Sequence, residues 1–110
     1  MEKLVWQNNT FDGVSVFKIF ESKSTKEIRI NLQSGSAMKE HQAPGAIMVQ
    51  VLRGEIDFGV NGEVIKLNEL DMITLEANVP HSLLASKDSI VRLSLSKNDD
   101  VSRVFGVLKN

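Results

Sequence analysis

The chain has 110 residues, no cysteine and a formal net charge of −1, with 13 basic and 14 acidic side chains. This length predicts one domain over residues 1–110, and an apolar share of 42% is too high for a disordered chain. The charge balance excludes a general electrostatic attraction to nucleic acid or to an anionic membrane, and the absence of thiols excludes disulfides and thiolate metal sites.

The chain also lacks the apolar segments that direct a protein to a membrane. Its longest apolar runs are far shorter than the roughly 20 residues that a membrane helix needs. The first residues carry neither the apolar core nor the small-residue cleavage site of a signal peptide. We therefore expect a cytoplasmic protein with no nucleic-acid partner and no membrane partner.

The first third of the chain predicts two strands. Residues 14–20 form a β-branched and aromatic run that is entered through an Asp12-Gly13 turn. Residues 27–32 alternate polar and apolar side chains, as a strand with one buried face does. A turn at Ser34-Gly35-Ser36 ends this second strand.

The next strand, residues 46–52, differs because it is apolar at nearly every position. A strand of this kind is typical of an element that is buried on both faces. Its outer face therefore needs a cover, which the N-terminal residues or a second subunit could provide. A second subunit would provide this cover through a two-fold interface, as in a homodimer.

A tight hairpin is the strongest local prediction. Asn61-Gly62 supplies the two positive φ angles of a type I′ turn, so residues 55–60 and 63–67 should pair as antiparallel strands.

Further strands are predicted toward the C-terminus. They cover residues 71–75, 82–85 and 89–95, with an Asn78-Val79-Pro80 corner before the second of them. Residues 101–108 could form an edge strand or a short helix. In total about eight to ten short strands at close spacing indicate a sandwich or barrel, whose interior is filled or holds one small ligand.

The only two histidines lie in two patterned segments. The first segment carries Gly35, His41 and Gly54, and the second carries Asp71 and a Pro80-His81 pair. These segments resemble the two sequence motifs of the cupin superfamily, and the likeness covers about residues 26–95. The resemblance implies an all-β fold, a double-stranded β-helix or jelly-roll barrel of two antiparallel sheets. Because small cupins are dimers more often than monomers, it also favours a homodimer. It places the two histidines at the mouth or in the interior of one barrel, on strands that face each other.

The chain departs from the cupin motifs at the positions that matter for chemistry. The metal-dependent cupins that these segments resemble bind their metal through three histidines and one glutamate. Ala43 and Ile47 occupy two of those four ligand positions here. In the second motif, Leu70 and Asn78 occupy positions where the family has glycine. The resemblance thus implies either no metal or a divalent transition metal (Zn, Ni, Fe or Mn) held weakly by His41 and His81.

Strand alternation predicts which neighbours of the histidines share the interior. If His41 and Ala43 point inward, then Glu40 and Gln42 point outward. The same rule directs Gln50 outward. The predicted ligand pocket consists of His41, Ala43, Ile47, Val49 and His81.

Three functions are compatible with this pocket. The first is binding of a small molecule with metal weak or absent, the histidines acting as hydrogen-bonding groups or as acid and base. The second is a metal-dependent oxygenase or isomerase with a two-histidine site. The third is a structural or regulatory dimeric module with a filled barrel. The sequence does not decide whether the protein is an enzyme or what its ligand is.

Overall fold

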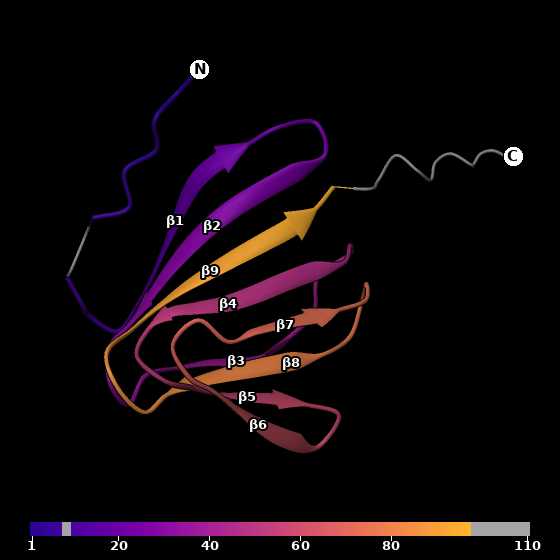
Figure 1. Ribbon diagram of the computed structural model, residues 1–110. Helices are drawn as coiled ribbons and strands as arrows, with labels where there is room; N and C mark the ends of the chain where they lie inside the picture. Colours follow the sequence, from indigo (N-terminus) through magenta and orange to yellow (C-terminus); the bar gives the residue numbers. More distant parts are fainter. Residues whose placement is uncertain (8–9, 98–110) are drawn as a thin grey trace, which may run out of the picture.

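The computed structural model describes residues 1–7 and 10–97, and within them the chain forms nine strands and no helix (Figure 1). Among these residues, no helix therefore qualifies as a membrane span. The strands are β1 (Val14–Glu21), β2 (Thr25–Leu32), β3 (Ala37–His41), β4 (Ile47–Arg53), β5 (Ile56–Val60), β6 (Glu63–Leu67), β7 (Met72–Leu75), β8 (His81–Ala85) and β9 (Ser89–Ser96).

The strands form two antiparallel sheets that pack face to face. The first sheet has the order β1-β2-β9-β4-β7 and the second has the order β3-β8-β5-β6. In Figure 1 they are the upper and lower layers of the molecule. From β2 onward the chain changes sheet at every connection except the β5–β6 hairpin. The predicted fold class, an all-β jelly roll of two antiparallel sheets, is confirmed.

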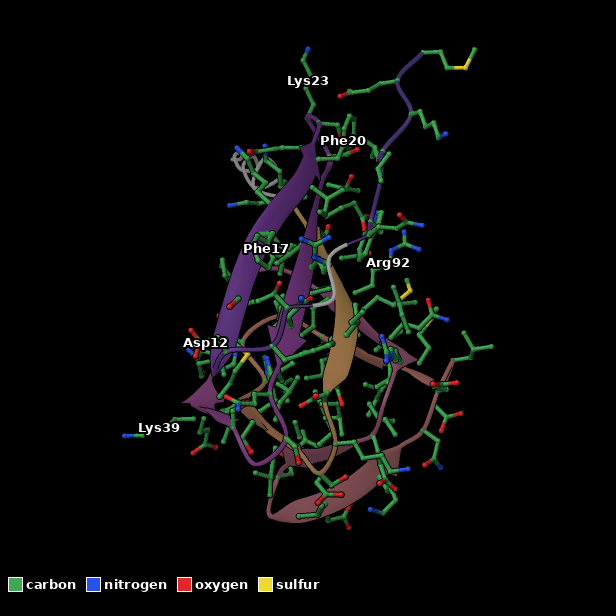
Figure 2. The ribbon with its side chains drawn as sticks, turned by 90° about the vertical axis from the view of Figure 1, so that its left-hand side faces the viewer. Asp12, Phe17, Phe20, Lys23, Lys39 and Arg92 are labelled. Carbon is green, nitrogen blue, oxygen red and sulfur yellow. The ribbon has the colours of Figure 1, made fainter. Side chains whose placement is uncertain are left out.

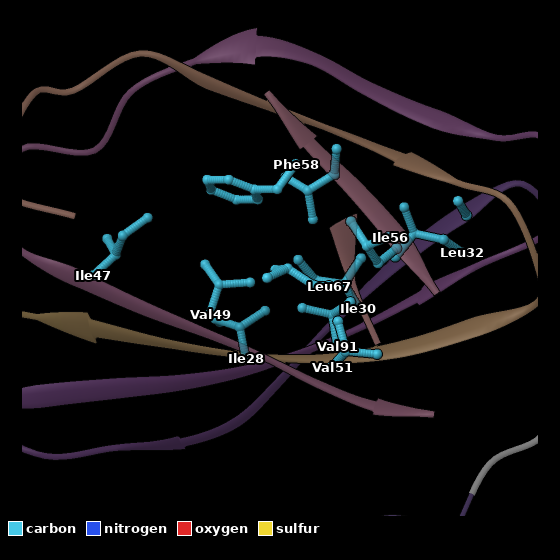
Figure 3. Packing of buried hydrophobic residues seen from close by; sticks show 12 residues of the cluster. Ile28, Ile30, Leu32, Ile47, Val49, Val51, Ile56, Phe58, Leu67 and Val91 are labelled. Atoms are coloured by element: carbon cyan, nitrogen blue, oxygen red, sulfur yellow. The ribbon is translucent and has the colours of Figure 1, made fainter. Parts of the chain in front are cut away.

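The core lies between the two sheets because each strand directs every second side chain inward. The upper sheet contributes Ile30 of β2, Val49 of β4 and Val91 of β9, and the lower sheet contributes Phe58 and Leu83 (Figure 3). Paired positions confirm the register, since Ile30 lies opposite Val91 and Phe58 lies opposite Leu83.

Eight of the nine strands were predicted, with ends correct to within two residues. The strand that we missed is β3, where only Met38 is even half-buried. Such an edge strand lacks the polar and apolar alternation that a sequence pattern detects. The predicted element at 101–108 lies outside the described residues.

The hairpin prediction is confirmed in detail. Asn61 and Gly62 have φ values of 52° and 79°, and the strands they join pair in register from Val60–Glu63 to Ile56–Leu67. The positive φ angles at both turn positions match the right-handed twist of the flanking strands.

The prediction that both faces of β4 are buried is wrong in part. Its inner residues, Ile47, Val49 and Val51, are buried as expected, but Met48 on the outer face is 40% exposed. Farther along β4, Leu52 borders a groove that Leu4 and other N-terminal residues also line. The outer face of β4 is thus open at one end, and the homodimer stays a prediction.

The N-terminal segment runs across the outside of the upper sheet (Figure 2). The Arg29 guanidinium donates a hydrogen bond to the Trp6 carbonyl oxygen at 3.0 Å, and its central carbon lies 4.3 Å from the ring centroid of Phe17. The Asn31 side-chain amide donates to the Thr10 carbonyl oxygen at 3.0 Å. These contacts attach a segment without regular structure to two buried polar side chains of β2.

Leu70 and Asn78, at motif positions where the family has glycine, both adopt a backbone conformation that favours glycine. Their φ values are 74° and 64°. A leucine in this left-handed region carries a steric cost of roughly 1–2 kcal/mol, whereas asparagine tolerates it well. Leu70 is 70% exposed and therefore gains little from burial.

Replacing Leu70 with glycine is expected to raise the free energy of unfolding by about 0.5–1 kcal/mol. Relief of the left-handed strain exceeds the entropy that a glycine adds to the unfolded chain. Asn78→Gly is the matched control, with an expected change of about zero. Urea denaturation of both variants measures the difference, and a loss of stability in Leu70→Gly would contradict this explanation.

Candidate functional site

The two histidines lie next to each other at one end of the lower sheet. His41 ends β3 and His81 begins β8, the two are cross-strand partners, and their ring centroids are 4.4 Å apart at an interplanar angle of 59°. The expectation that their strands face each other is wrong, because β3 and β8 are neighbours in one sheet. The Asn78 N–H donates to the Ala43 carbonyl oxygen at 2.7 Å, which joins the loop after His41 to the loop before His81.

Both imidazole rings are held in the same way. Nδ1 of His41 lies 2.7 Å from the Lys39 carbonyl oxygen, and Nδ1 of His81 lies 2.9 Å from the Val79 carbonyl oxygen. A carbonyl oxygen only accepts, so Nδ1 is assigned as the donor in each ring. In the neutral form each Nε2 then carries a lone pair that can accept a hydrogen bond or bind a metal.

The surroundings of His81 favour its neutral form. The side chain is only 3% exposed, and its ring stacks on Phe58 with centroids 5.6 Å apart and planes 12° from parallel. Burial lowers the pKa of His81 below its ordinary value of 6.5, and a charge on the neighbouring His41 lowers the pKa further. The hydrogen bond to the Val79 carbonyl oxygen raises the pKa, by less than burial lowers it but by more than the effect of His41. At neutral pH, His81 is therefore an acceptor at Nε2.

An open cavity of about 770 Å³ lies above the two rings, between the ends of the two sheets. Its lining consists of Glu21, Lys26, His41, Gln42, Ala43, Pro44, Gly45, Ile47, His81, Leu93, Leu95, Ser96 and Lys97. Four of the five predicted pocket residues are in this lining. The fifth, Val49, borders a separate space of about 10 Å³ beneath the cavity. His41, His81 and Leu93 border both spaces and so form the floor of the cavity.

Strand parity predicted one of the neighbouring side chains wrongly. Gln42, which was expected to point outward, lines the cavity. The reason is that β3 ends at His41, so the alternation of a strand no longer applies to the next residue. Glu40 is exposed and absent from the lining, as expected. The Gln50 amide donates to the Leu70 carbonyl oxygen on the outside of β4, also as expected.

The opposite wall of the cavity comes from residues that the sequence patterns did not single out. They are supplied by the β1–β2 hairpin and by β9: Glu21, Lys26, Leu93, Leu95, Ser96 and Lys97. Alternation along β2 and β9 directs Lys26 and Leu95 to the same face as the core, so this signal was available. For Glu21 and Lys97 no local signal existed, because only the pairing of the strands brings them to the cavity.

Glu21 and Lys97 form an ion pair at the mouth of the cavity. Lys97 Nζ is 2.7 Å from one carboxylate oxygen of Glu21, and Lys18 Nζ is 3.1 Å from the other. The hydrogen bond from Lys97, followed by the one from Lys18, lowers the pKa of Glu21 from 4.5 to about 2. Glu21 is thus fully charged at neutral pH, and cations already occupy both of its oxygens.

The donor set at the histidines does not fit the four-ligand metal centre of metal-dependent cupins. Two imidazole Nε2 atoms are available, while the side chains at the other two ligand positions, Ala43 and Ile47, have no donor atom. Among the residues that the structure describes, no group of three His, Cys, Asp or Glu side chains is placed to hold a metal ion. We therefore derive no reaction step through a metal.

Comparison with known proteins identifies the same fold. A family model described as the cupin domain matches residues 28–96. No curated protein matches the sequence.

Several solved structures resemble the chain closely in shape. An RmlC-like cupin protein from Desulfovibrio desulfuricans superposes with a TM-score of 0.78 and 21% identity, over 87% of this chain and 95% of that one. KdgF from a Halomonas species gives 0.72 and 19%, over 84% of each chain. A salicylate 1,2-dioxygenase from Pseudoaminobacter salicylatoxidans gives 0.76 and 20%, over 84% of this chain but 27% of that one. At these identities the likeness concerns the fold alone.

Proposed function

Since this chain belongs to the cupin domain family, we propose that it binds one small organic molecule in the barrel, with a hydroxyl or N–H group of the molecule donating to His81. The observation that carries the proposal is the pair of Nε2 atoms at the floor of a cavity of about 770 Å³. That volume is within the range of about 300–1,000 Å³ of small-molecule sites.

The apolar part of the lining supports a ligand with a hydrophobic body. Ile47, Leu93 and Leu95 line one side of the cavity, and Ala43 and Pro44 line another. A few polar groups that converge in an otherwise apolar cavity are typical of a site that orients one ligand. The same open volume argues against the filled-barrel module, because no side chain of residues 1–7 or 10–97 fills this end of the barrel.

Titration with para-cresol tests the proposal, because this probe has an apolar body and one hydroxyl donor. We expect it to bind to the wild-type protein and His81→Ala to weaken the affinity about five-fold, as for the loss of one hydrogen bond of about 1 kcal/mol. Because only the neutral ring accepts, binding should also weaken as the pH falls through the lowered pKa of His81. Calorimetry at several pH values measures both effects.

The controls separate hydrogen bonding from apolar contact and from misfolding. Para-methylanisole, which lacks the hydroxyl donor, should bind to the wild type more weakly than para-cresol does. The His81→Ala variant should bind the two probes with equal affinity. Gln50→Ala alters a side chain outside the cavity and should leave both affinities unchanged. Equal binding of the two probes to the wild type would reject the proposed role of His81.

The runner-up is a metal-dependent oxygenase or isomerase with a two-histidine site. One observation favours it: hydrogen bonds from Nδ1 to backbone carbonyl oxygens orient both rings, as metal-bound imidazoles commonly are. Elemental analysis of protein purified without an affinity tag separates the two functions. Near-stoichiometric Zn, Ni, Fe or Mn that is lost in His81→Ala would favour the metal-dependent one.

A further inference from the structure

The charges around the mouth of the cavity do not cancel. Among the described residues, three charged side chains line it: Glu21, Lys26 and Lys97. Glu21 and Lys97 are 2.7 Å apart and offset each other. His81 adds no charge, because its neutral form prevails at neutral pH. One positive charge therefore remains, on Lys26.

Lys26 has no ion-pair partner within the described part of the chain. Its cross-strand neighbour in the β1–β2 hairpin is Glu21, but Lys18 and Lys97 occupy the two oxygens of that carboxylate. The Lys26 side chain is half-buried, on the inner face of β2 opposite Leu95. A lysine that is held beside apolar surface and lacks a carboxylate partner is suited to pair with a bound anion.

Lys26 and the two histidines lie at different depths in the cavity. Lys26, Ile28 and Ile30 succeed one another along the inner face of β2, and Ile30 borders the small space beneath the histidines. Lys26 is therefore at the mouth, whereas His41 and His81 form the floor. Leu95 lines the wall between them, and Leu93 of the floor continues this apolar surface along β9.

From this arrangement we infer that the ligand is a monocarboxylate, with its carboxylate at Lys26, an apolar body along β9 and a hydroxyl or N–H donor at the histidine floor. This inference rests on the proposed function and adds the charge and the orientation of the ligand. The carboxylate would form a charge-assisted hydrogen bond with the Lys26 ammonium group.

Two probes of nearly the same shape test the inference, para-hydroxybenzoate and its uncharged amide, para-hydroxybenzamide. We expect the acid to bind the wild type about five-fold more tightly than the amide, which corresponds to a partly exposed ion pair of about 1 kcal/mol. In Lys26→Met the two affinities should become equal through weaker binding of the acid, and Lys26→Arg should restore the preference. Added salt should reduce the preference in the wild type.

Lys23→Met is the matched control. Lys23 lies at the tip of the same hairpin and outside the cavity lining, so this variant loses the same charge without touching the site (Figure 2). It should keep the five-fold preference. Thermal melting of the three variants verifies that each is folded.

The possible failures are distinguishable. If both probes bind equally and Lys26→Met changes neither affinity, the inference is wrong while the proposed pocket stands. If neither probe binds to the folded wild type at millimolar concentration, the proposed function fails and the inference with it. A preference that Lys23→Met also abolishes would reduce the effect to general surface charge and would equally overturn the role of Lys26.

Discussion

Replacing Phe58 with alanine is expected to lower the free energy of unfolding by about 3–5 kcal/mol, the largest effect that we predict. Phe58 is completely buried among the core side chains (Figure 3). It lies opposite Leu83 and stacks on His81. Its removal opens a void directly beneath the histidine floor, and the two rigid sheets cannot collapse to fill it. Urea denaturation, followed by circular dichroism, measures the loss.

Phe58→Leu is the control for this variant, since it retains most of the apolar volume and should cost only about 1–1.5 kcal/mol. NMR titration of His81 provides a second measurement. Loss of the stacked ring admits water to the imidazole, so the pKa of His81 should rise toward 6.5 in Phe58→Ala and less in Phe58→Leu. A stability equal to that of the wild type would show that Phe58 does not support the floor of the site.

Gly54→Ala is expected to cost about 3 kcal/mol, through two additive effects. Gly54 has a φ of 93°, a conformation that costs a residue with a Cβ roughly 1–2 kcal/mol. A Cβ at this position would also overlap with the Ser89 side chain and the Asp88 carbonyl oxygen, and overpacking costs a further 1–3 kcal/mol or so.

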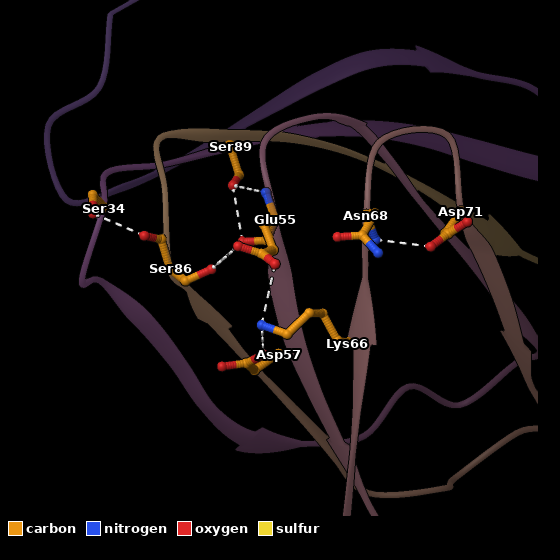
Figure 4. Close-up of polar contacts among 8 residues, drawn as sticks. All are labelled: Ser34, Glu55, Asp57, Lys66, Asn68, Asp71, Ser86 and Ser89. Carbon is orange, nitrogen blue, oxygen red and sulfur yellow. Dashed lines mark hydrogen bonds and ion pairs between the residues drawn. The ribbon is translucent and has the colours of Figure 1, made fainter.

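The overlap would also disturb a hydrogen-bond network around the buried Ser89 hydroxyl group at this end of the barrel. The Ser89 hydroxyl oxygen accepts from the Glu55 N–H at 3.0 Å and lies 2.8 Å from the Lys87 carbonyl oxygen. Around it, the Ser86 hydroxyl group donates to the Glu55 carboxylate, which pairs with Lys66 (Figure 4). No other residue type fits between this network and the turn without displacing one of them.

Gly35→Ala is the control that shows the backbone cost alone, because Gly35 has a nearly equal φ of 88° but no atom within 4 Å of an added Cβ. The difference between the two variants is then the steric cost at Gly54. We expect Gly35→Ala to lose only the backbone part, about 1–2 kcal/mol. Chemical denaturation of the two variants gives the difference. An equal loss in both would mean that the close approach of Ser89 adds nothing.

Local patterns in the sequence predicted most of the strands because their causes are local. Asn61-Gly62 determines its hairpin through two backbone angles, and the alternation in 27–32 marks one buried face whatever lies opposite. The edge strand β3 has no such pattern, since its side chains are mostly exposed. It exists because it pairs with β8, whose residues are forty or more positions away from their partners in the sequence.

For the candidate site, the resemblance to cupins placed His41 and His81 in one barrel on strands that face each other. In the structure they are instead cross-strand partners within one sheet, with ring centroids 4.4 Å apart. The resemblance could not indicate which residues form the opposite wall of the cavity. The ion pair of Glu21 with Lys97 depends on the alignment of β1, β2 and β9. The same alignment leaves Lys26 without an ion-pair partner among the residues that the structure describes. A side chain's charge is known from its identity, but whether another side chain neutralises it depends on the register.

The sequence by itself thus determined the fold class, the hairpin and two positions at which imidazoles could act, because these follow from periodicity, backbone preference and motif. Only the tertiary structure decided that Gln42 faces the cavity and Val49 lies beneath it. It also decided that Leu70 keeps a backbone conformation suited to glycine. Each of these depends on where a strand ends and what packs against it, and such contacts form only when distant segments meet.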